Sequence, residues 1–247
     1  MLTEQRYDII LKLLQEKGTV TIGEILEILD ASESTVRRDI TALHKAGKLV
    51  KVFGGAVAVN HNVVSNEPTV AQKVEMNMSE KKKIAAYAVS LIQENEFIFM
   101  DAGTTTECMI DVLPTKNMTI VTNGVVHARL LAAAGHRVIL LGGELKGSTE
   151  AVVGNAALRQ LMDYHFTKGF FGTNGVTRTT GMTTPDAGEA LIKRTAMEHC
   201  RDCFVLADSS KFDFISSVTF APFDRPVIIT DREIEGYKDC KHVIAVK

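Results

Sequence analysis

The sequence contains no apolar run long enough to cross a lipid bilayer. Apolar stretches such as 97–100 and 138–141 span four residues each, whereas a membrane-spanning helix needs about 20 apolar residues. The first six residues also lack the basic and apolar segments of a secretory signal peptide. We therefore expect a cytoplasmic protein with no membrane contact.

Cysteine is scarce, with four in 247 residues, which is too few for a disulfide framework. Cys200 and Cys203 are spaced as C-x-x-C, but a zinc knuckle needs a second ligand pair, and only the isolated Cys108 and Cys240 remain. The pair also lies where a predicted helix runs into a predicted strand, which favours structural thiols. We expect neither a metal site nor a cofactor.

A large charge imbalance is also missing, since the net charge of the whole chain is −2. Locally the balance differs. Residues 32–51 carry five basic side chains against two acidic ones, a net charge of +3. A basic face on an acidic chain is typical of a compact DNA-binding module, although short charge clusters are more often ordinary solvated surface.

The N-terminal part shows the pattern of three short helices followed by a hairpin. Apolar residues recur at helical spacing within 3–17, Thr21 caps a second short helix, and a third helix follows the next turn. Two strand-like runs, 49–53 and 56–59, flank a glycine pair. This order of elements is that of a winged helix-turn-helix.

The rest of the chain, residues 59–247, is predicted to form a connecting segment and a larger domain. Periodicity is lost after residue 59, and Ser79 is expected to cap a long amphipathic helix. Strands such as 97–100 then alternate with helices such as 105–113, which predicts an α/β domain with a mostly parallel sheet. We predict three segments: a DNA-binding domain at 1–58, a linker at 59–77 and a sensor domain at 78–247.

The third helix of the N-terminal part, which begins at Ser32 or Glu33, is the most informative stretch. Its expected exposed face holds short hydroxyls and two arginines, opposite an apolar face. Hydroxyls at a helix start suit phosphate contacts, and arginine can chelate guanine in the major groove. The pattern alone also fits an ordinary exposed helix with a charge cluster. The candidate DNA-binding residues are Ser32, Ser34, Thr35, Arg37, Arg38, Lys48 and Lys51.

Several spaced positions in this part together resemble the signature of the DeoR family of transcriptional regulators. Arg6, Ile10 and Leu14 are followed, after seventeen residues, by the stretch 32–40. The run 54–56 also resembles that family's wing. The resemblance implies a repressor that binds double-stranded operator DNA as a homo-oligomer, either a dimer or a tetramer.

Small and polar residues follow four predicted strands of the second domain. They lie at 101–106, 122–124, 142–146 and 172–175. In a parallel sheet, loops at the carboxyl ends of strands meet at one edge, where ligands bind. Glycine and threonine beside helix amides in the first loop suit a phosphate, although the same residues are common as plain helix caps.

The stretch from about Glu80 to Asp231 resembles the DeoR-type sensor, which is similar to ribose-phosphate isomerases, glucosamine-phosphate deaminases and CoA-transferases. This resemblance implies that 101–106 cradle a phosphate and that Asn123 lines the pocket. It also implies that 172–175 with Thr183, Thr184 and Asp186 surround a sugar, and that Lys211 pairs with a ligand anion. The candidate effector-binding residues are Asp101, Gly103, Thr104, Thr105, Thr106, Asn123, Gly142, Gly143, Asn174, Gly175, Asp186 and Lys211.

Two other functions remain open at this stage. An isomerase-like enzyme fused to a DNA-binding module would need a base, for which Asp101, Glu144, Asp186 and Glu189 are the candidates. A purely architectural DNA binder would not need so large a second domain. A fold similar to that of the isomerases does not imply catalysis, so we expect no enzymatic activity. The run 181–186 most resembles fructose-operon repressors, which implies fructose 1-phosphate as effector, with tagatose 6-phosphate next.

Overall fold

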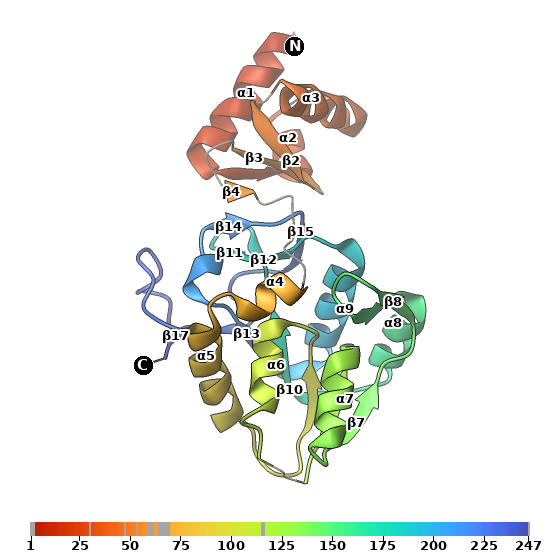
Figure 1. Cartoon of the computed structure of the whole chain (residues 1–247). Helices are drawn as coiled ribbons and strands as arrows, with labels where there is room; N and C mark the ends of the chain where they lie inside the picture. The colour runs from red at the N-terminus through yellow and green to blue at the C-terminus, as the bar shows by residue number, and fades with distance from the viewer. Residues whose placement is uncertain are drawn as a thin grey trace.

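The computed structural model describes residues 3–29, 31–46, 48–52, 54–58, 62–63, 70–114 and 117–246. In these ranges an N-terminal helical domain lies above a larger α/β domain (Figure 1). Within the same ranges, no helix combines the length and the apolar character needed to cross a membrane.

The N-terminal domain contains three helices and a small antiparallel sheet. Its elements are α1 (Thr3–Lys17), β1 (Thr19–Thr21), α2 (Ile22–Ile28), α3 (Glu33–Lys45), β2 (Leu49–Val52) and β3 (Gly55–Ala58). The strands are ordered β1-β3-β2. This arrangement confirms the predicted winged helix-turn-helix and adds β1, which the sequence did not predict.

Local sequence signals explain where these helices begin. The Thr21 side chain accepts a hydrogen bond from the Glu24 amide, and the Glu24 carboxylate accepts one from the Thr21 amide, so both ends of a capping box are present. Ser32 caps α3 by accepting a hydrogen bond from the Thr35 amide. The apolar faces of the three helices meet in one core that includes Ile10, Ile25 and Ile40.

The two glycines of the wing are required for different reasons. Gly54 has φ +85°, a conformation that residues with a side chain rarely adopt. A Cβ on Gly55 would lie 2.1 Å from the Val20 carbonyl oxygen, so only glycine lets β3 approach β1 this closely. Phe53 and Val59, at the ends of the predicted hairpin runs, lie outside the described residues.

The segment predicted as a linker contains regular structure where it is described. β4 (Asn62–Val63) pairs in parallel with β14 (Phe214–Ile215), and α4 (Val70–Glu75) leads to α5 (Met78–Ser90). Residues 59–61 and 64–69 of the predicted linker lie outside the described residues. The prediction that Ser79 caps α5 is wrong: the N-cap is Asn77, in a left-handed conformation, and Ser79 Oγ donates to Glu80.

The C-terminal domain alternates strands and helices as predicted. After α5 its elements are β5 (Phe97–Met100), α6 (Thr104–Ile110), β6 (Thr119–Thr122), α7 (Val125–Ala133), β7 (Arg137–Leu140), β8 (Glu144–Lys146), β9 (Ala151–Val153), α8 (Asn155–Met162), β10 (Phe166–Gly172), β11 (Gly175–Thr177), β12 (Gly181–Thr184), α9 (Ala187–Glu198), β13 (Cys200–Leu206), the 3-10 helix η1 (Ser209–Lys211), β14, β15 (Val218–Ala221), β16 (Val227–Thr230) and β17 (Val243–Ala245).

Seven strands of this domain form one parallel sheet in the order β17-β16-β13-β10-β5-β6-β7. The chain starts at β5, runs outward to β7, returns to the other side of β5 with β10, and then runs outward to β17. The strand order therefore reverses between β5 and β10. In open α/β sheets, the crevice outside the carboxyl ends of such a strand pair is where ligands bind.

Two apolar cores cover the two faces of this sheet. Ile98 and Met100 pack with α5 and α6 on one face, whereas Phe99 packs with α8 and α9 on the other. The neighbouring Phe170 and Phe171 divide between the same two cores. Because adjacent side chains of a strand point to opposite faces, both faces are closed and the sheet can act as a rigid base.

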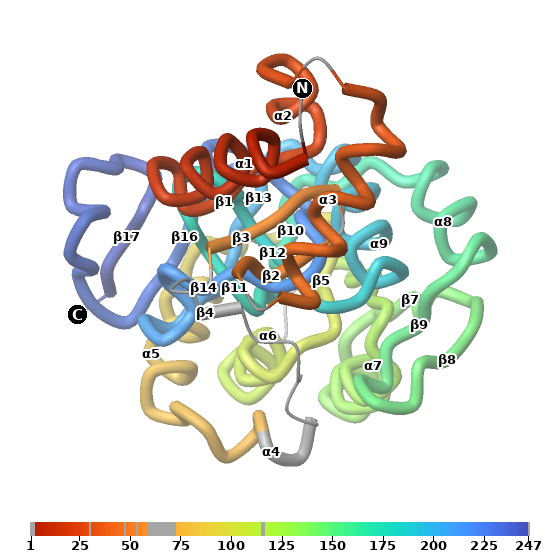
Figure 2. Tube along the Cα trace, turned by 90° about the horizontal axis from the view of Figure 1, so that it is seen from above, coloured from red at the N-terminus to blue at the C-terminus, as the bar shows by residue number. Residues whose placement is uncertain are grey.

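A small antiparallel sheet, β11-β12-β15, lies between the large sheet and the N-terminal domain (Figures 1 and 2). The turn between β11 and β12 contacts that domain, since Thr19 Oγ1 lies 3.3 Å from the hydroxyls of both Thr179 and Thr180. The sequence did not predict this sheet.

Candidate nucleic-acid interface and ligand cavity

The exposed face of α3 has the composition that the sequence predicted. Arg37 and Arg38 are exposed, while Val36, Ile40 and Leu43 are buried on the opposite face. The Arg37 guanidinium donates to Glu33 one turn earlier, at 2.6 Å. Such an exposed pair contributes little to stability, so Arg37 can exchange it for another anion at small cost.

Three hydroxyls gather at the N-terminus of α3. Ser32 Oγ lies 3.0 Å from Ser34 Oγ and 2.9 Å from Thr35 Oγ1. Ser32 and Ser34 are exposed and Thr35 is half-buried. Hydroxyl groups at a helix start are well placed to donate to a phosphate oxygen.

The two predicted lysines lie next to this face. Lys48 directly precedes β2 and Lys51 lies within it. Both are exposed, and Lys51 Nζ donates to Thr41 Oγ1 of α3 at 2.9 Å. The wing and α3 therefore present their cations on adjoining surfaces.

Asp39, counted among the acids of this segment, lies inside the domain and not on its surface. It accepts hydrogen bonds from Arg6 Nε at 2.6 Å and from a second Arg6 nitrogen at 3.1 Å, which joins α3 to α1. Because its charge is matched internally, the exposed surface of 32–51 is more basic than the residue count suggests.

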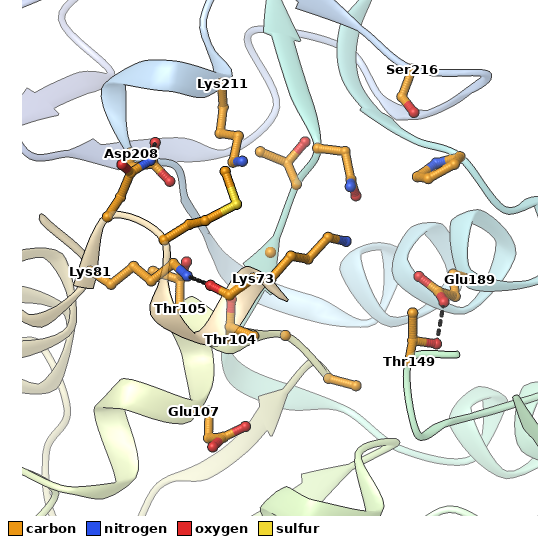
Figure 3. Close-up of a pocket in the computed structure, with 18 of the residues that line it drawn as sticks. Lys73, Lys81, Thr104, Thr105, Glu107, Thr149, Glu189, Asp208, Lys211 and Ser216 are labelled. Atoms are coloured by element: carbon orange, nitrogen blue, oxygen red, sulfur yellow. Dashed lines mark hydrogen bonds between the residues drawn. The ribbon is translucent and has the colours of Figure 1, made fainter. Parts of the chain in front are cut away.

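The second candidate site is a cavity of about 340 Å³ at the carboxyl ends of β5 and β10, the point where the strand order reverses. Loops from both halves of the sheet form its walls, and α4, α5, α9 and β14 close it (Figure 3). Three of the four polar loops that were predicted to meet here, 101–106, 122–124 and 172–175, contribute to its walls, whereas 142–146 does not.

Five of the twelve predicted effector residues line the cavity. They are Gly103, Thr104, Thr105, Asn174 and Lys211. Within the described part of the chain, the hydroxyls of Thr104 and Thr105 have no hydrogen-bond partner, so both can donate to a ligand.

Four predicted residues are buried behind the cavity wall. They are Asp101, Thr106, Asn123 and Gly175. Asn123 Oδ1 accepts a hydrogen bond from the Ala102 amide at 2.9 Å, which fixes the loop after β5. These residues shape the wall and do not form its surface.

The other three predicted residues lie outside the wall. Gly142 and Gly143 are exposed on the loop after β7, where the Gly142 amide donates to Gln160 Oε1 at 3.0 Å. Asp186 caps α9 by accepting a hydrogen bond from the Glu189 amide at 2.8 Å. Its other oxygen lies 3.4 Å from Lys146 Nζ.

Three cavity lysines were not predicted: Lys73, Lys81 and Lys193. A signal for two of them exists in the sequence, because Lys81 shares the apolar face of α5 with Ile84 and Ala88, and Lys193 shares that of α9 with Ala190. A lysine at helical spacing with buried residues points inward. Lys73 lies in the stretch read as a linker and carries no such pattern.

Lysine side chains dominate one end of the cavity. Lys81 and Lys211 lie there with Asp208, on the side opposite Glu189 and Thr149 (Figure 3). Burial lowers the pKa of Lys81, the nearby Lys211 and Lys73 lower it further, and Asp208 opposes them. An anion bound here would relieve the repulsion between these ammonium groups.

Acidic groups line the other walls. Glu189 accepts hydrogen bonds from Lys146 Nζ at 2.8 Å and from Thr149 Oγ1 at 2.6 Å. Burial raises the pKa of Glu107, and the neighbouring Asp111 and Glu150 add to this rise. These walls offer acceptors that suit the hydroxyls of a sugar.

Beneath the cavity, Lys193 forms a buried ion pair with Asp101. The second contact of the Asp101 carboxylate is the Gly172 amide, which donates at 3.0 Å. Burial raises the pKa of Asp101, whereas the charge and hydrogen bond of Lys193 lower it. The pair joins the ends of β5 and β10 to α9.

His127 lines the cavity as a neutral ring. Burial lowers its pKa from 6.5 to about 4. The Thr106 hydroxyl has one proton and lies 2.7 Å from two carbonyl oxygens, so His127 Nε2 must be the donor in its 3.1 Å contact with Thr106 Oγ1. Nδ1 therefore carries a lone pair.

No cluster of three or more potential metal ligands occurs among the residues that the structure describes. Cys200 and Cys203 are buried at the start of β13, in the core that also contains Met197.

Comparison with known families identifies both domains. Residues 6–62 match the DeoR-like helix-turn-helix domain, and residues 76–232 match the DeoR C terminal sensor domain. The chain is 41% identical over 252 residues to the "Uncharacterized HTH-type transcriptional regulator FruR" of Bacillus subtilis, a match that covers 100% of both chains. It is 35% identical to the lactose phosphotransferase system repressor of Staphylococcus aureus, over 98% of this chain and 96% of that protein.

Among solved structures, ribose 5-phosphate isomerase A of Methanocaldococcus jannaschii aligns with 55% of each chain at 18% identity, with a TM-score of 0.42. From the two domain matches and the full-length similarity to FruR, this chain belongs to the DeoR family of transcriptional regulators.

Proposed function

We propose that this protein represses a sugar-utilisation operon by binding operator DNA, and that a phosphorylated sugar in the C-terminal cavity regulates this binding. The observation that carries the proposal is the lysine-rich end of the cavity, where the ammonium groups of Lys81 and Lys211 and the Thr104 and Thr105 hydroxyls lie with one carboxylate of the described residues, Asp208 (Figure 3). A phosphate monoester dianion supplies the missing negative charge.

The DNA contacts in this proposal come from α3 and the wing. The hydroxyls at the start of α3 contact phosphates, and Arg37 and Arg38 reach base edges or phosphates in the major groove. Lys48 and Lys51 contact the backbone beside them. A homo-oligomer places two such domains on successive half-sites, and an effector that binds one sensor conformation better than another changes their spacing.

Fructose 1-phosphate is our first candidate for the effector, and tagatose 6-phosphate is the second. Full-length similarity to a regulator named FruR supports the first, and similarity to lactose phosphotransferase system repressors supports the second. We further propose that the protein acts in the cytoplasm, and that residues 1–58 and 78–247 are its two functional domains.

The arrangement of the carboxylates in and near the cavity favours ligand binding over catalysis. Asp101 is ion-paired with Lys193, Glu189 accepts hydrogen bonds from two groups, and Asp186 caps α9. Glu144 is exposed on β8 and does not line the cavity. Each of the four bases that an isomerase could use is thus engaged or misplaced, and the relatives reported above are transcriptional regulators.

Thermal unfolding with a panel of sugar phosphates tests the proposal, because a ligand that binds the folded state raises the melting temperature. We expect fructose 1-phosphate to raise it and free fructose to leave it unchanged. The same ligand should alter operator affinity in a gel-shift assay at fixed salt. Equal affinity for fructose and its phosphate ester in calorimetry would refute the phosphate site, and turnover of the ester would favour the enzyme.

A further inference from the structure

Helix α4 belongs to the segment between the two domains, yet it forms part of the cavity wall. Lys73, Met76 and Asn77 all line the cavity. The helix packs against α6, the element that carries Thr104 and Thr105. The ligand site is therefore not built by the sensor domain alone.

Lys73 faces the site with both its side chain and its backbone. Its side chain extends across the cavity, away from Lys81 (Figure 3). Its carbonyl oxygen accepts a hydrogen bond from Lys81 Nζ. Lys81 is almost fully buried, so this contact anchors α4 to the sensor domain from within the cavity wall.

The joint between α4 and α5 is held by another residue of the cavity wall. Asn77 has φ +54°, a left-handed conformation that is unfavourable for most residues with a side chain. Its side-chain amide donates to Asp208 Oδ1 at 3.0 Å and to Ser210 Oγ at 3.1 Å. The direction in which α4 leaves α5 therefore depends on groups that also line the cavity.

The interdomain segment meets the cavity at a second place. β4 pairs with β14, and both residues of β14 line the cavity. Two described parts of the segment, β4 and α4, thus touch walls of the same site.

We propose that Lys73 is an effector-binding residue carried by the interdomain segment, and that its ammonium group, which extends across the cavity (Figure 3), binds the phosphoryl group of the effector. This inference rests on the proposed function, since it assumes an anionic ligand. A bound phosphoryl group adds charge-assisted hydrogen bonds between α4 and the sensor domain. Ligand binding then fixes the position of α4. By linkage, a change in the position of α4 alters the affinity for the ligand.

Hydrogen exchange of the full-length protein tests this inference, with inorganic phosphate and fructose 1-phosphate as probes. Either probe should slow exchange of the amides in residues 70–77 of the wild type. Lys73→Met should bind both probes about 10- to 100-fold more weakly in calorimetry, the range expected for one charged hydrogen bond. Its residues 70–77 should show little protection at probe concentrations that saturate the wild type.

Lys83→Met is the matched control. Lys83 is exposed on α5 and does not line the cavity, so the variant loses the same charge but should bind and protect like the wild type. Comparing the melting temperatures of both variants with that of the wild type separates weaker binding from unfolding.

The possible outcomes separate this inference from the proposed function. Wild-type affinity in Lys73→Met, or unchanged exchange in residues 70–77 of a saturated wild type, would overturn the inference and leave the sugar-phosphate site intact. Protection by inorganic phosphate that requires Lys73, without binding of sugar phosphates, would support the inference and refute the proposed effector class. Binding of neither probe would overturn both.

Discussion

Asp101 and Lys193 form an ion pair directly beneath the ligand cavity, with side chains that are 2% and 4% exposed. Asp101 follows β5 and Lys193 lies on α9, so the pair ties an inner strand of the sheet to a helix on one of its faces. Lys193 Nζ also donates to the Gly172 carbonyl oxygen at 3.2 Å. One buried lysine thus connects the carboxyl ends of both strands at the point where the strand order reverses.

Removing one partner of this pair should destabilise the sensor domain. Lys193→Met leaves the Asp101 carboxylate buried without its counter-ion, and we expect the free energy of unfolding to fall by about 3–5 kcal/mol. Urea denaturation at pH 7 measures this loss. The double variant Asp101→Asn with Lys193→Met should recover part of it, since neither charge remains. Wild-type stability in Lys193→Met alone would contradict the view that this pair secures the cavity floor.

His127 should make the stability of the protein depend on pH below neutrality. Its pKa is about 4 in the folded protein and 6.5 when it is solvated. Between these values the unfolded chain takes up a proton that the folded protein does not, so the free energy of unfolding falls as the pH decreases from 6.5 to 4. This group alone should remove about 2–3 kcal/mol by pH 4.5.

The variant His127→Gln separates this contribution from that of the carboxylates. Glutamine can still donate to Thr106 but does not titrate, so its stability should decrease less between pH 7 and pH 4.5. Urea unfolding of both proteins at the two pH values gives the comparison. An identical loss in wild type and variant would show that His127 is not kept neutral by the fold.

Arg38→Ala should weaken operator binding without affecting the fold. Arg38 is exposed on α3, opposite the apolar face, so its loss removes a DNA contact and no packing. We expect a cost of about 1–3 kcal/mol, with relaxed sequence preference if the arginine reads a base. Arg37→Ala should cost a similar amount.

Fluorescence anisotropy at fixed salt measures these affinities, and Arg201→Ala provides the control. Arg201 is an exposed arginine of the C-terminal domain that pairs with Asp202, so this variant makes the same change of charge far from α3. If Arg37→Ala and Arg38→Ala both bind operator as tightly as the control, α3 is not the recognition helix.

Thr105→Val should weaken effector binding by about 1–3 kcal/mol, because it removes a cavity donor and nearly preserves shape. Thr106→Val serves as a comparison for Thr105→Val. The Thr106 hydroxyl bonds only to groups inside the protein, among them the Asp101 carbonyl oxygen. Its loss should lower the melting temperature more than that of Thr105. Calorimetry with fructose 1-phosphate that finds no change in Thr105→Val would exclude this hydroxyl from the site.

The N-terminal domain could be predicted almost completely because its determinants are local. The caps at Thr21 and Ser32, the apolar spacing of the helices and the left-handed turn at Gly54 each act within a few residues. The burial of Asp39 could not be predicted in this way. Its partner Arg6 lies 33 residues away, and only the packed structure brings them together.

The small sheet of the C-terminal domain escaped prediction because its strands give no alternating pattern. All residues of β11 and β12 are buried on both faces, so polar residues such as Thr177 and Thr183 occupy positions that usually mark a surface. Helix α4 is only six residues long, which is too short to show a clear helical periodicity.

The sequence predicted the position of the cavity more accurately than the residues that line it and their roles. Threonines and glycine at the end of β5 form a local motif, and the structure places Gly103, Thr104 and Thr105 in the wall. The buried role of Asp101 depends on Lys193, 92 residues away, and no local signal couples the two. The lysines that line the cavity come from separate segments of the chain, and of these the sequence indicated only Lys211.

The reversal of strand order also determines when each part of the protein can form during synthesis. All strands of the N-terminal sheet lie within residues 19–58, so this domain can fold soon after it leaves the ribosome. The cavity can form only after β10 has been synthesised and has paired with β5. Lys211 is synthesised later still. A nascent or truncated chain that ends before β10 would therefore carry a complete helix-turn-helix domain and no cavity. Under the function proposed above, such a fragment would bind DNA without any response to the effector.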